Sequence, residues 1–248
     1  MALALAAGLL LTGASDPVLV PEVSQHAVRV RQGFTGAELL LFGAITTPEG
    51  MRIAPDYDIV VVVKGPVESI RLREKRRVAG IWVNSTSTGF RSAPSFYALA
   101  STRPVRDLVD ERTAAIYELG LSSLQLSPIG AINPAEQARF SAGLVDLKRR
   151  QGLYAEDPHG VRMRGQVLYQ ARIDLPSNVL TGRYTAETFA IRKGRVVTSA
   201  ISEIAVRKEG FELLVANAAE NDGLWYGLLA VALSVGMGWA AGRLFALG

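Results

Sequence analysis

The sequence predicts a mainly β protein: an immunoglobulin-like β-sandwich with an inserted α-helical hairpin, followed by one C-terminal transmembrane helix. Three observations lead to this prediction. Short β-prone runs separated by Gly, Pro, Asn and Asp fill residues 27–101 and 161–206. Helical periodicity with capping residues marks the insertion at residues 103–152. Residues 223–242 carry no charged side chain, and Arg243 follows them directly.

The start of the chain, MALALAAGLLLTGA, is apolar and ends in small residues, as the core and cleavage site of a signal peptide do. We therefore expect residues 1–14 to be a signal peptide or its remnant, and residues 15–222 to form an exported domain. A basic n-region is missing. Two alternatives follow from this: a start site assigned downstream of the real one, or an uncleaved apolar anchor.

Composition excludes several kinds of chemistry. The chain has no cysteine and two histidines, which excludes disulfides, thiolate metal sites and histidine-rich metal sites. The net charge of +4 over 248 residues is too small to indicate nucleic-acid binding. We therefore expect no cofactor and no nucleic-acid partner.

The early β block contains two apolar runs and one charged hairpin. Residues 39–45 and 59–63 are apolar on both alternating faces, which predicts central strands covered on both sides. Residues 69–84 are expected to form a hairpin with a charged tip, where basic residues surround the single acid Glu74. One interpretation is an anion or lipid-headgroup contact, and the alternative is a solvated loop that protects a strand edge. The basic residues are Arg71, Arg73, Lys75, Arg76 and Arg77.

The insertion is expected to hold two helices. Pro104 can occupy the first turn of the first helix, whose apolar face continues until Gly120 ends it. Asn133 is expected to cap the second helix, with Pro134 at its first position and Glu136 completing a capping box. A basic run that begins at Lys148 is expected in its last turn, where cations favour the helix dipole.

Strands return between residues 161 and 206. A strand that ends in Leu175-Pro176, followed by Gly182-Arg183-Tyr184, is typical of the late strands of an immunoglobulin-like sandwich. A tyrosine at this position often bonds to the backbone at the sheet corner, so Tyr184 is interpreted as structural. We expect one sandwich built from early and late strands. Two separate small β domains flanking the helices are the alternative.

Candidate catalytic or metal-ligating residues are few. Glu156, Asp157 and His159 lie in one short segment and could together ligate a cation. No further nitrogen ligand is close in sequence, so a plain polar turn is the favoured interpretation. We therefore predict no catalytic residue and no metal site.

The C-terminal segment is predicted to cross a membrane, because twenty helical residues span roughly 30 Å, about the thickness of a hydrocarbon core. Ser234, Gly238 and Gly242 recur at a four-residue spacing and would let a second helix approach closely. The membrane-interface anchors are expected to be Trp225, Tyr226, Trp239 and Arg243.

Charge on either side of the segment predicts its orientation. Acidic Glu220 and Asp222 precede it and Arg243 follows it, so the positive-inside rule places the N-terminal domain in the periplasm. Residues 243–248 would then be a cytoplasmic tail. The expected location is the bacterial inner membrane, with a single pass.

Several motifs resemble the putative transmembrane protein family of alphaproteobacteria, an uncharacterised family with an exported domain and a membrane segment. The motifs are residues 33–44 (GFTGAELLLFGA), 61–66 (VVVKGP), 78–84 (VAGIWVN), 94–98 (PSFYA) and 171–176 (ARIDLP). The resemblance implies no catalytic residues. It implies an accessory role near a transporter, through an association with sulfite-exporter-type permeases.

Together these observations predict a membrane-anchored periplasmic binding or accessory module. Its expected partners are the lipid bilayer and either an integral membrane protein or a second copy of the chain, bound through the transmembrane helix. The alternative is a membrane-tethered periplasmic enzyme or small-ligand receptor, with its site between the sandwich and the helices. A third interpretation is a purely structural envelope protein.

Overall fold

The computed structural model describes residues 17–30, 34–46, 57–130, 132–208 and 223–246. The predicted signal peptide at residues 1–14 lies outside the described residues. The described chain is mainly β, as predicted.

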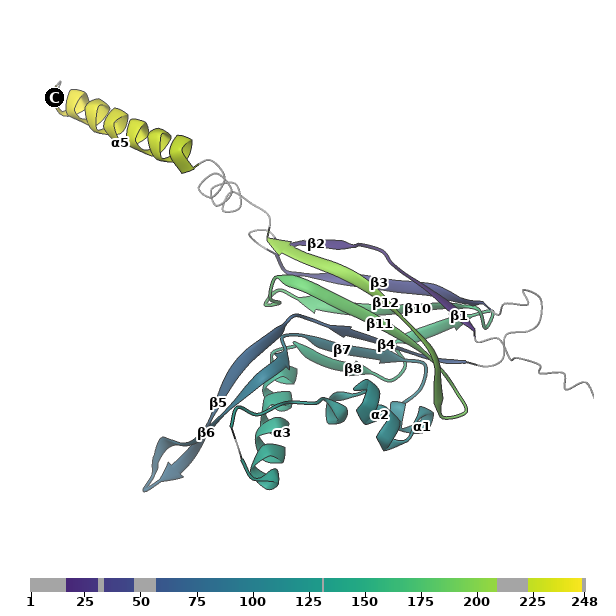
Figure 1. The fold of residues 1–248 in the computed structure, drawn as a ribbon. Coiled ribbons are helices and arrows are strands. Elements are labelled where there is room, and N and C mark those ends of the chain that lie inside the picture. The colour runs from purple at the N-terminus through teal and green to yellow at the C-terminus, as the bar shows by residue number, and fades with distance from the viewer. Residues whose placement is uncertain (1–16, 31–33, 47–56, 131, 209–222, 247–248) are drawn as a thin grey trace, which may run out of the picture.

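Most strands belong to two sheets that share one hydrophobic core (Figure 1). The four-stranded sheet has the order β1-β3-β10-β9, formed by β1 (Val18–Val23), β3 (Gly36–Thr46), β9 (Val161–Arg164) and β10 (Leu168–Pro176). The six-stranded sheet has the order β2-β12-β11-β4-β7-β8. Its strands are β2 (Ala27–Val30), β4 (Asp58–Lys64), β7 (Tyr97–Ser101), β8 (Tyr154–Asp157), β11 (Gly182–Arg192) and β12 (Arg195–Lys208).

Early and late strands pair with one another in both sheets. β3 pairs antiparallel with β10, and β4 pairs antiparallel with β11. This pairing is incompatible with two separate small β domains, the alternative considered from the sequence. The immunoglobulin-like assignment stays a prediction.

Burial of the two apolar runs differs. Residues 59–63 of β4 are at most 1% exposed, which confirms a central strand covered on both faces. The same prediction for residues 39–45 is wrong, because β3 alternates between buried and open positions and Phe42 is 39% exposed. β3 contributes one face to the core, and its other face lies on the outside of the four-stranded sheet.

The first predicted helix is interrupted. α1 (Val105–Leu108) and α2 (Glu111–Tyr117) replace the single helix expected between Pro104 and Gly120. The Asp110 side chain accepts a hydrogen bond from the Thr113 backbone N–H at 2.8 Å and starts α2 as its N-cap. Helical periodicity alone did not reveal this second cap.

The second helix is confirmed. α3 (Pro134–Arg150) begins after Asn133, whose side chain accepts a hydrogen bond from the Glu136 backbone N–H at 2.8 Å. The short 3-10 turn η1 (Leu121–Ser123) lies between α2 and α3. Figure 1 shows α1, α2 and α3 gathered beside β7 and β8, at one side of the sheets.

Tyr184 has the structural role expected of it. Its hydroxyl donates a hydrogen bond to the Leu180 carbonyl at 2.7 Å, four residues upstream, and its ring is fully buried. Burial also raises the pKa of this phenol to about 12. The tyrosine therefore joins the start of β11 to the loop before it.

The C-terminal segment forms a helix, α5 (Gly223–Ala246). The prediction that it is a transmembrane helix is wrong: across the described parts of the chain, no helix is both long and apolar enough to cross a membrane.

Candidate functional site

The third sheet is a long two-stranded hairpin, formed by β5 (Val67–Val78) and β6 (Ile81–Pro94). It extends past α3 and away from the other two sheets (Figure 1). The residues from 75 to 85 are all exposed to solvent. We call residues 75–85 the arm. At about 3.4 Å per residue, its strands reach roughly 15 Å beyond Glu74.

The turn at the end of the arm is Ala79-Gly80, where both central residues have positive φ, 48° and 86°. Positive φ at both positions is the requirement of the type I′ turn, the two-residue turn whose twist matches that of a hairpin. The predicted charged tip is therefore placed wrongly. The basic residues lie along β5, and the turn itself is flanked by apolar residues.

We call Val78, Ile81, Trp82 and Val83 the apolar tip. Their exposed fractions are 53%, 69%, 66% and 40%, respectively. Such large side chains gathered at one exposed point mark an interaction site more often than scattered surface residues do. The charged residues before Val78 had been expected to form the tip, although Gly80, which adopts positive φ without steric cost, was a local signal for the turn.

The strand register distributes the apolar tip over both faces of the arm. Arg77 pairs with Trp82, and Val78 pairs with Ile81. Directly paired residues share a face and successive residues alternate, so Trp82 lies on one face and the other three apolar side chains lie on the opposite face. The end of the arm is therefore apolar on both sides.

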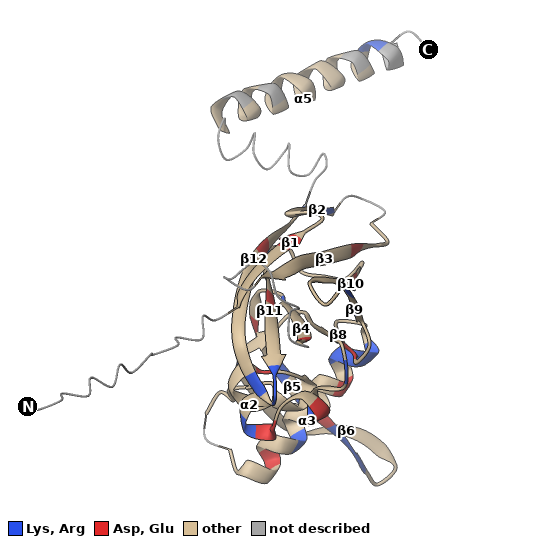
Figure 2. Cartoon of the chain, turned by 90° about the vertical axis from the view of Figure 1, so that its right-hand side faces the viewer, with Lys and Arg blue, Asp and Glu red and all other residues tan. Residues whose placement is uncertain are grey.

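The basic cluster of Arg71, Arg73, Lys75, Arg76 and Arg77 begins next to Val78, with Arg77 and Arg76 paired opposite Trp82 and Val83, and is exposed throughout. Figure 2 shows basic residues along this hairpin. The Arg77 Nε donates a hydrogen bond to the Gly80 carbonyl at 3.3 Å. Glu74, the acid within the cluster, is engaged by other residues. Its carboxylate accepts a hydrogen bond from the Thr86 hydroxyl at 2.8 Å and forms an ion pair with Arg139 of α3 at 3.3 Å.

Two ion pairs join β5 to α3 and hold the base of the hairpin. Glu74 pairs with Arg139 near the start of α3, and Glu68 pairs with Lys148 near its end. The second pair is largely buried, because the Lys148 side chain is 6% exposed and that of Glu68 is 27% exposed. The Lys148 ammonium also lies 3.5 Å from the Ser95 carbonyl. We call the Glu68–Lys148 pair the buried clamp.

A small hydrophobic core supports the same contact. Phe90 and Ala93 of β6 pack with Phe140 and Leu144 of α3 and with Leu126, all of them at most 6% exposed. This cluster is separate from the main core between the sheets. An isolated two-stranded hairpin is marginally stable in water, so this packing is what keeps the arm ordered and directed outward.

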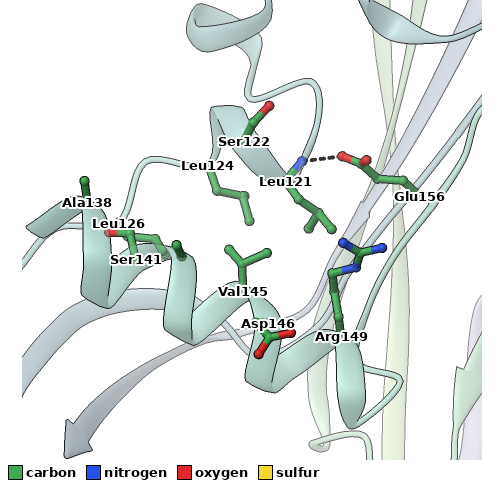
Figure 3. Close-up of a pocket in the computed structure, with 11 residues that line it drawn as sticks. Leu121, Ser122, Leu124, Leu126, Ala138, Ser141, Val145, Asp146, Arg149 and Glu156 are labelled. Carbon is green, nitrogen blue, oxygen red and sulfur yellow. Dashed lines mark hydrogen bonds between the residues drawn. The ribbon is translucent and has the colours of Figure 1, made fainter. Parts of the chain in front are cut away.

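A cavity of about 550 Å³ lies between α3 and η1 (Figure 3). Leu124 and Val145 line its apolar part, and Arg149 and Glu156 lie at its other end. The Glu156 carboxylate accepts a hydrogen bond from the Leu121 backbone N–H, which is drawn as a dashed line in Figure 3. Glu156 thus stabilises the start of the 3-10 turn.

The candidate cation site is not assembled. Glu156, Asp157 and His159 are all exposed. Asp157 accepts a hydrogen bond from the His159 backbone N–H at 3.0 Å, as a polar turn does. Among the described residues, no group of three or more acidic or histidine side chains could hold a metal ion.

Sequence reasoning missed one polar cluster, because its members are far apart in the chain. Lys64 of β4 pairs with Glu118, whose carboxylate also accepts from the Gln125 backbone N–H at 3.0 Å. Glu187 of β11 lines the same cavity of about 300 Å³, and burial raises its pKa while Lys64 opposes that shift. The cluster ties the end of α2 to the sheet.

The predicted contact residues of α5 are exposed. The Ser234 hydroxyl donates to the Ala230 carbonyl within the helix at 2.9 Å, and a side chain added at Gly238 or Gly242 would meet open space. The Arg243 guanidinium lies 5.7 Å from the centre of the Trp239 ring. Nothing tests an association of α5 with another helix, which stays a prediction.

The fold and the site define a class of protein: a mainly β domain with a projecting hairpin that is basic along one strand and apolar at its tip. The chain belongs to the family described as "Putative transmembrane protein (Alph_Pro_TM)", which matches residues 18–246. The resemblance seen in the sequence motifs is therefore confirmed. The description indicates membrane association and names no activity. No curated protein matches the chain.

Proposed function

We propose that this protein is a binding or accessory module that works at a membrane, with its β domain on the periplasmic side of the bacterial inner membrane. The observation that carries the proposal is the arm: eleven consecutive exposed residues, 75–85, that end in an apolar tip. The family description supports the membrane setting.

The architecture of the hairpin supports a recognition role. Exposing Trp82 and Ile81 to water has an unfavourable free energy, of order 1.5–3 kcal/mol for each large apolar side chain relative to burial. The base of the hairpin is held on α3 by the buried clamp and by the Phe90 cluster. A rigid base with an unburied tip is the arrangement expected when a partner supplies the missing contact.

The alternative of an enzyme was based on Glu156, Asp157 and His159, and the structure does not assemble these residues into a site. Glu156 is bonded to the η1 backbone, and Asp157 is bonded to the His159 backbone N–H. All three side chains are exposed to solvent. A binding role therefore agrees better with the observed geometry than catalysis at this segment does.

The partner class proposed from the family resemblance is an integral membrane transporter, such as a sulfite-exporter-type permease. The test places a photo-crosslinking amino acid at Ile81 in the full chain, in native membranes. Arg195 is the matched control position, because it also follows a two-residue turn with positive φ at Lys193 and Gly194, and it is also exposed.

A specific covalent adduct at position 81, with none at position 195, is the expected result. Equal labelling at both positions would contradict a recognition role for the arm, and labelling at neither would contradict a protein partner at the tip.

A further inference from the structure

We infer that the surface bound by the arm is an anionic lipid bilayer, with the apolar tip in the interfacial layer and the basic cluster among the headgroups. This inference rests on the proposed function, because it names the partner of the same arm.

The apolar tip is better suited to insertion into a lipid interface, which surrounds it, than to contact with a flat protein surface, which covers one face. Trp82 lies on one face of the arm, while Val78 and Ile81 lie on the other. A protein docked against one face would leave the opposite apolar side chains in water. Immersion of the end of the hairpin in a lipid interface covers both faces at once. Tryptophan is the side chain most suited to that layer, because its ring is apolar and its N–H can remain hydrated.

The order of residues along β5 matches the layers of a bilayer surface. Val78 and Ile81 lie next to the turn, Arg77 and Arg76 lie level with Trp82 and Val83 of the paired strand, and Lys75 follows at roughly 3.4 Å per residue. The arm itself contains no acidic residue, and Glu74 at its base is neutralised by Arg139. A cluster of Lys and Arg beside an apolar anchor is attracted by the negative potential of anionic lipids.

The hairpin also sets a limit on depth. The outer edge of a two-stranded sheet leaves backbone N–H and carbonyl groups unpaired, and hydrocarbon cannot hydrogen-bond to them. Asn84 and Ser85 follow the apolar tip and are polar and exposed. We therefore place residues 76–83 in the hydrated interface, where water still reaches the backbone and the guanidinium groups of Arg76 and Arg77 reach the headgroups, and the rest of the arm above it.

The chain contains no native cysteine, so single cysteines can be introduced cleanly into the full-length protein. The variants Ile81→Cys and Arg195→Cys each carry an environment-sensitive fluorophore. The full chain is then mixed with nanodiscs of phosphatidylcholine, or of phosphatidylcholine and phosphatidylglycerol in equal parts. We expect a blue shift and quenching by spin-labelled lipid at position 81 in the anionic nanodiscs. Position 195 should show neither.

Charge removal tests the electrostatic half of the inference. The variant K75Q/R76Q/R77Q changes three exposed side chains, so its unfolding midpoint should stay that of the parent. Each basic residue near an anionic surface strengthens binding about fivefold. Loss of three should therefore lower the binding constant of the arm for anionic nanodiscs by about 100-fold. Raised salt should weaken the parent signal in the same direction.

The outcomes separate the two proposals. A photo-crosslink from position 81 to a protein, with no lipid-dependent fluorescence change, overturns the bilayer inference and leaves the recognition role standing. A fluorescence change that is equal in neutral and anionic nanodiscs overturns the role of the basic cluster. Neither crosslink nor fluorescence change at position 81 overturns both proposals.

Discussion

Removing Glu68 from the buried clamp should destabilise the protein strongly, because it leaves the Lys148 ammonium without its counter-ion. The Lys148 side chain is 6% exposed, and its remaining polar contact is the Ser95 carbonyl at 3.5 Å, a long hydrogen bond. Breaking a buried ion pair by removing one partner costs about 3–5 kcal/mol. The Glu68 side chain is 27% exposed, so water can partly replace it, and we expect a loss of about 3 kcal/mol for Glu68→Ala.

The loss is measured as the change in free energy of unfolding, by urea denaturation followed by circular dichroism. Arg139→Ala is the matched control, because it breaks the other ion pair between β5 and α3. That pair is more exposed, 54% for Arg139 and 32% for Glu74, so it should contribute less than about 1 kcal/mol. A loss for Glu68→Ala no larger than for the control would refute the reasoning.

A second variant distinguishes the effect of the unpaired Lys148 charge from the effect of lost side-chain packing. In the double variant E68L/K148M, no charge is left in the site, and apolar side chains of similar volume fill it. Replacing a buried ion pair in this way is often neutral or stabilising. We therefore expect the double variant to be closer to the parent than Glu68→Ala is. If it is equally unstable, packing and not the buried ammonium is the cause.

Three further predictions concern local features. Burial by itself raises the pKa of Asp58. Its hydrogen bonds and ion pair with Arg103 lower that pKa by more than burial raises it, so the net shift is downward. A lowered folded-state pKa gives stability that is present above the unfolded value of about 3.9 and lost as pH falls through the folded value. Asp58→Asn should therefore be less stable than the parent near neutral pH, and the difference should shrink in acid denaturation below about pH 4. Ala79→Asn should stabilise the turn by about 0.5–1 kcal/mol, measured by hydrogen exchange of the arm amides, because asparagine tolerates the positive φ of 48° better than alanine does. Tyr184→Phe should lower the free energy of unfolding by about 1 kcal/mol, since the bond to Leu180 is lost.

Each of these has a clear contrary result. A stability difference for Asp58→Asn that stays constant down to the lowest pH would mean that the carboxylate gains nothing from Arg103. Faster exchange of the arm amides in Ala79→Asn would argue against the type I′ turn. Unchanged stability in Tyr184→Phe would mean that the corner bond is fully replaced by water.

Local signals predicted those parts of the fold that short-range physics controls. The cap of α3 at Asn133 and the corner bond of Tyr184 each depend on a few neighbouring residues, and both are found as expected. The interruption of the first helix is local too. The Asp110-to-Thr113 cap is a standard N-terminal signal, but it lay inside a longer apolar periodicity that hid it.

The hairpin shows where interpretation of the sequence went wrong. Charge at residues 74–77 suggested a solvated tip, whereas backbone geometry puts the turn at Ala79-Gly80. The charges at residues 75–77 are exposed because this end of β5 extends beyond α3, and not because the chain turns there. The local turn signal was therefore more informative than the charge.

The sequence by itself determined the mainly β character, the second helix and the family to which the chain belongs. Tertiary structure alone decided which side chains are buried and which are left open. Lys148 was expected in the last turn of a helix, and only the tertiary structure shows that it is buried there, because β5 lies across that turn and supplies Glu68. The apolar tip has the composition of a core strand. Val78, Ile81 and Trp82 are nevertheless exposed, because the hairpin extends beyond α3, which covers only its base. Both outcomes depend on contacts between segments distant in sequence, which no local pattern encodes.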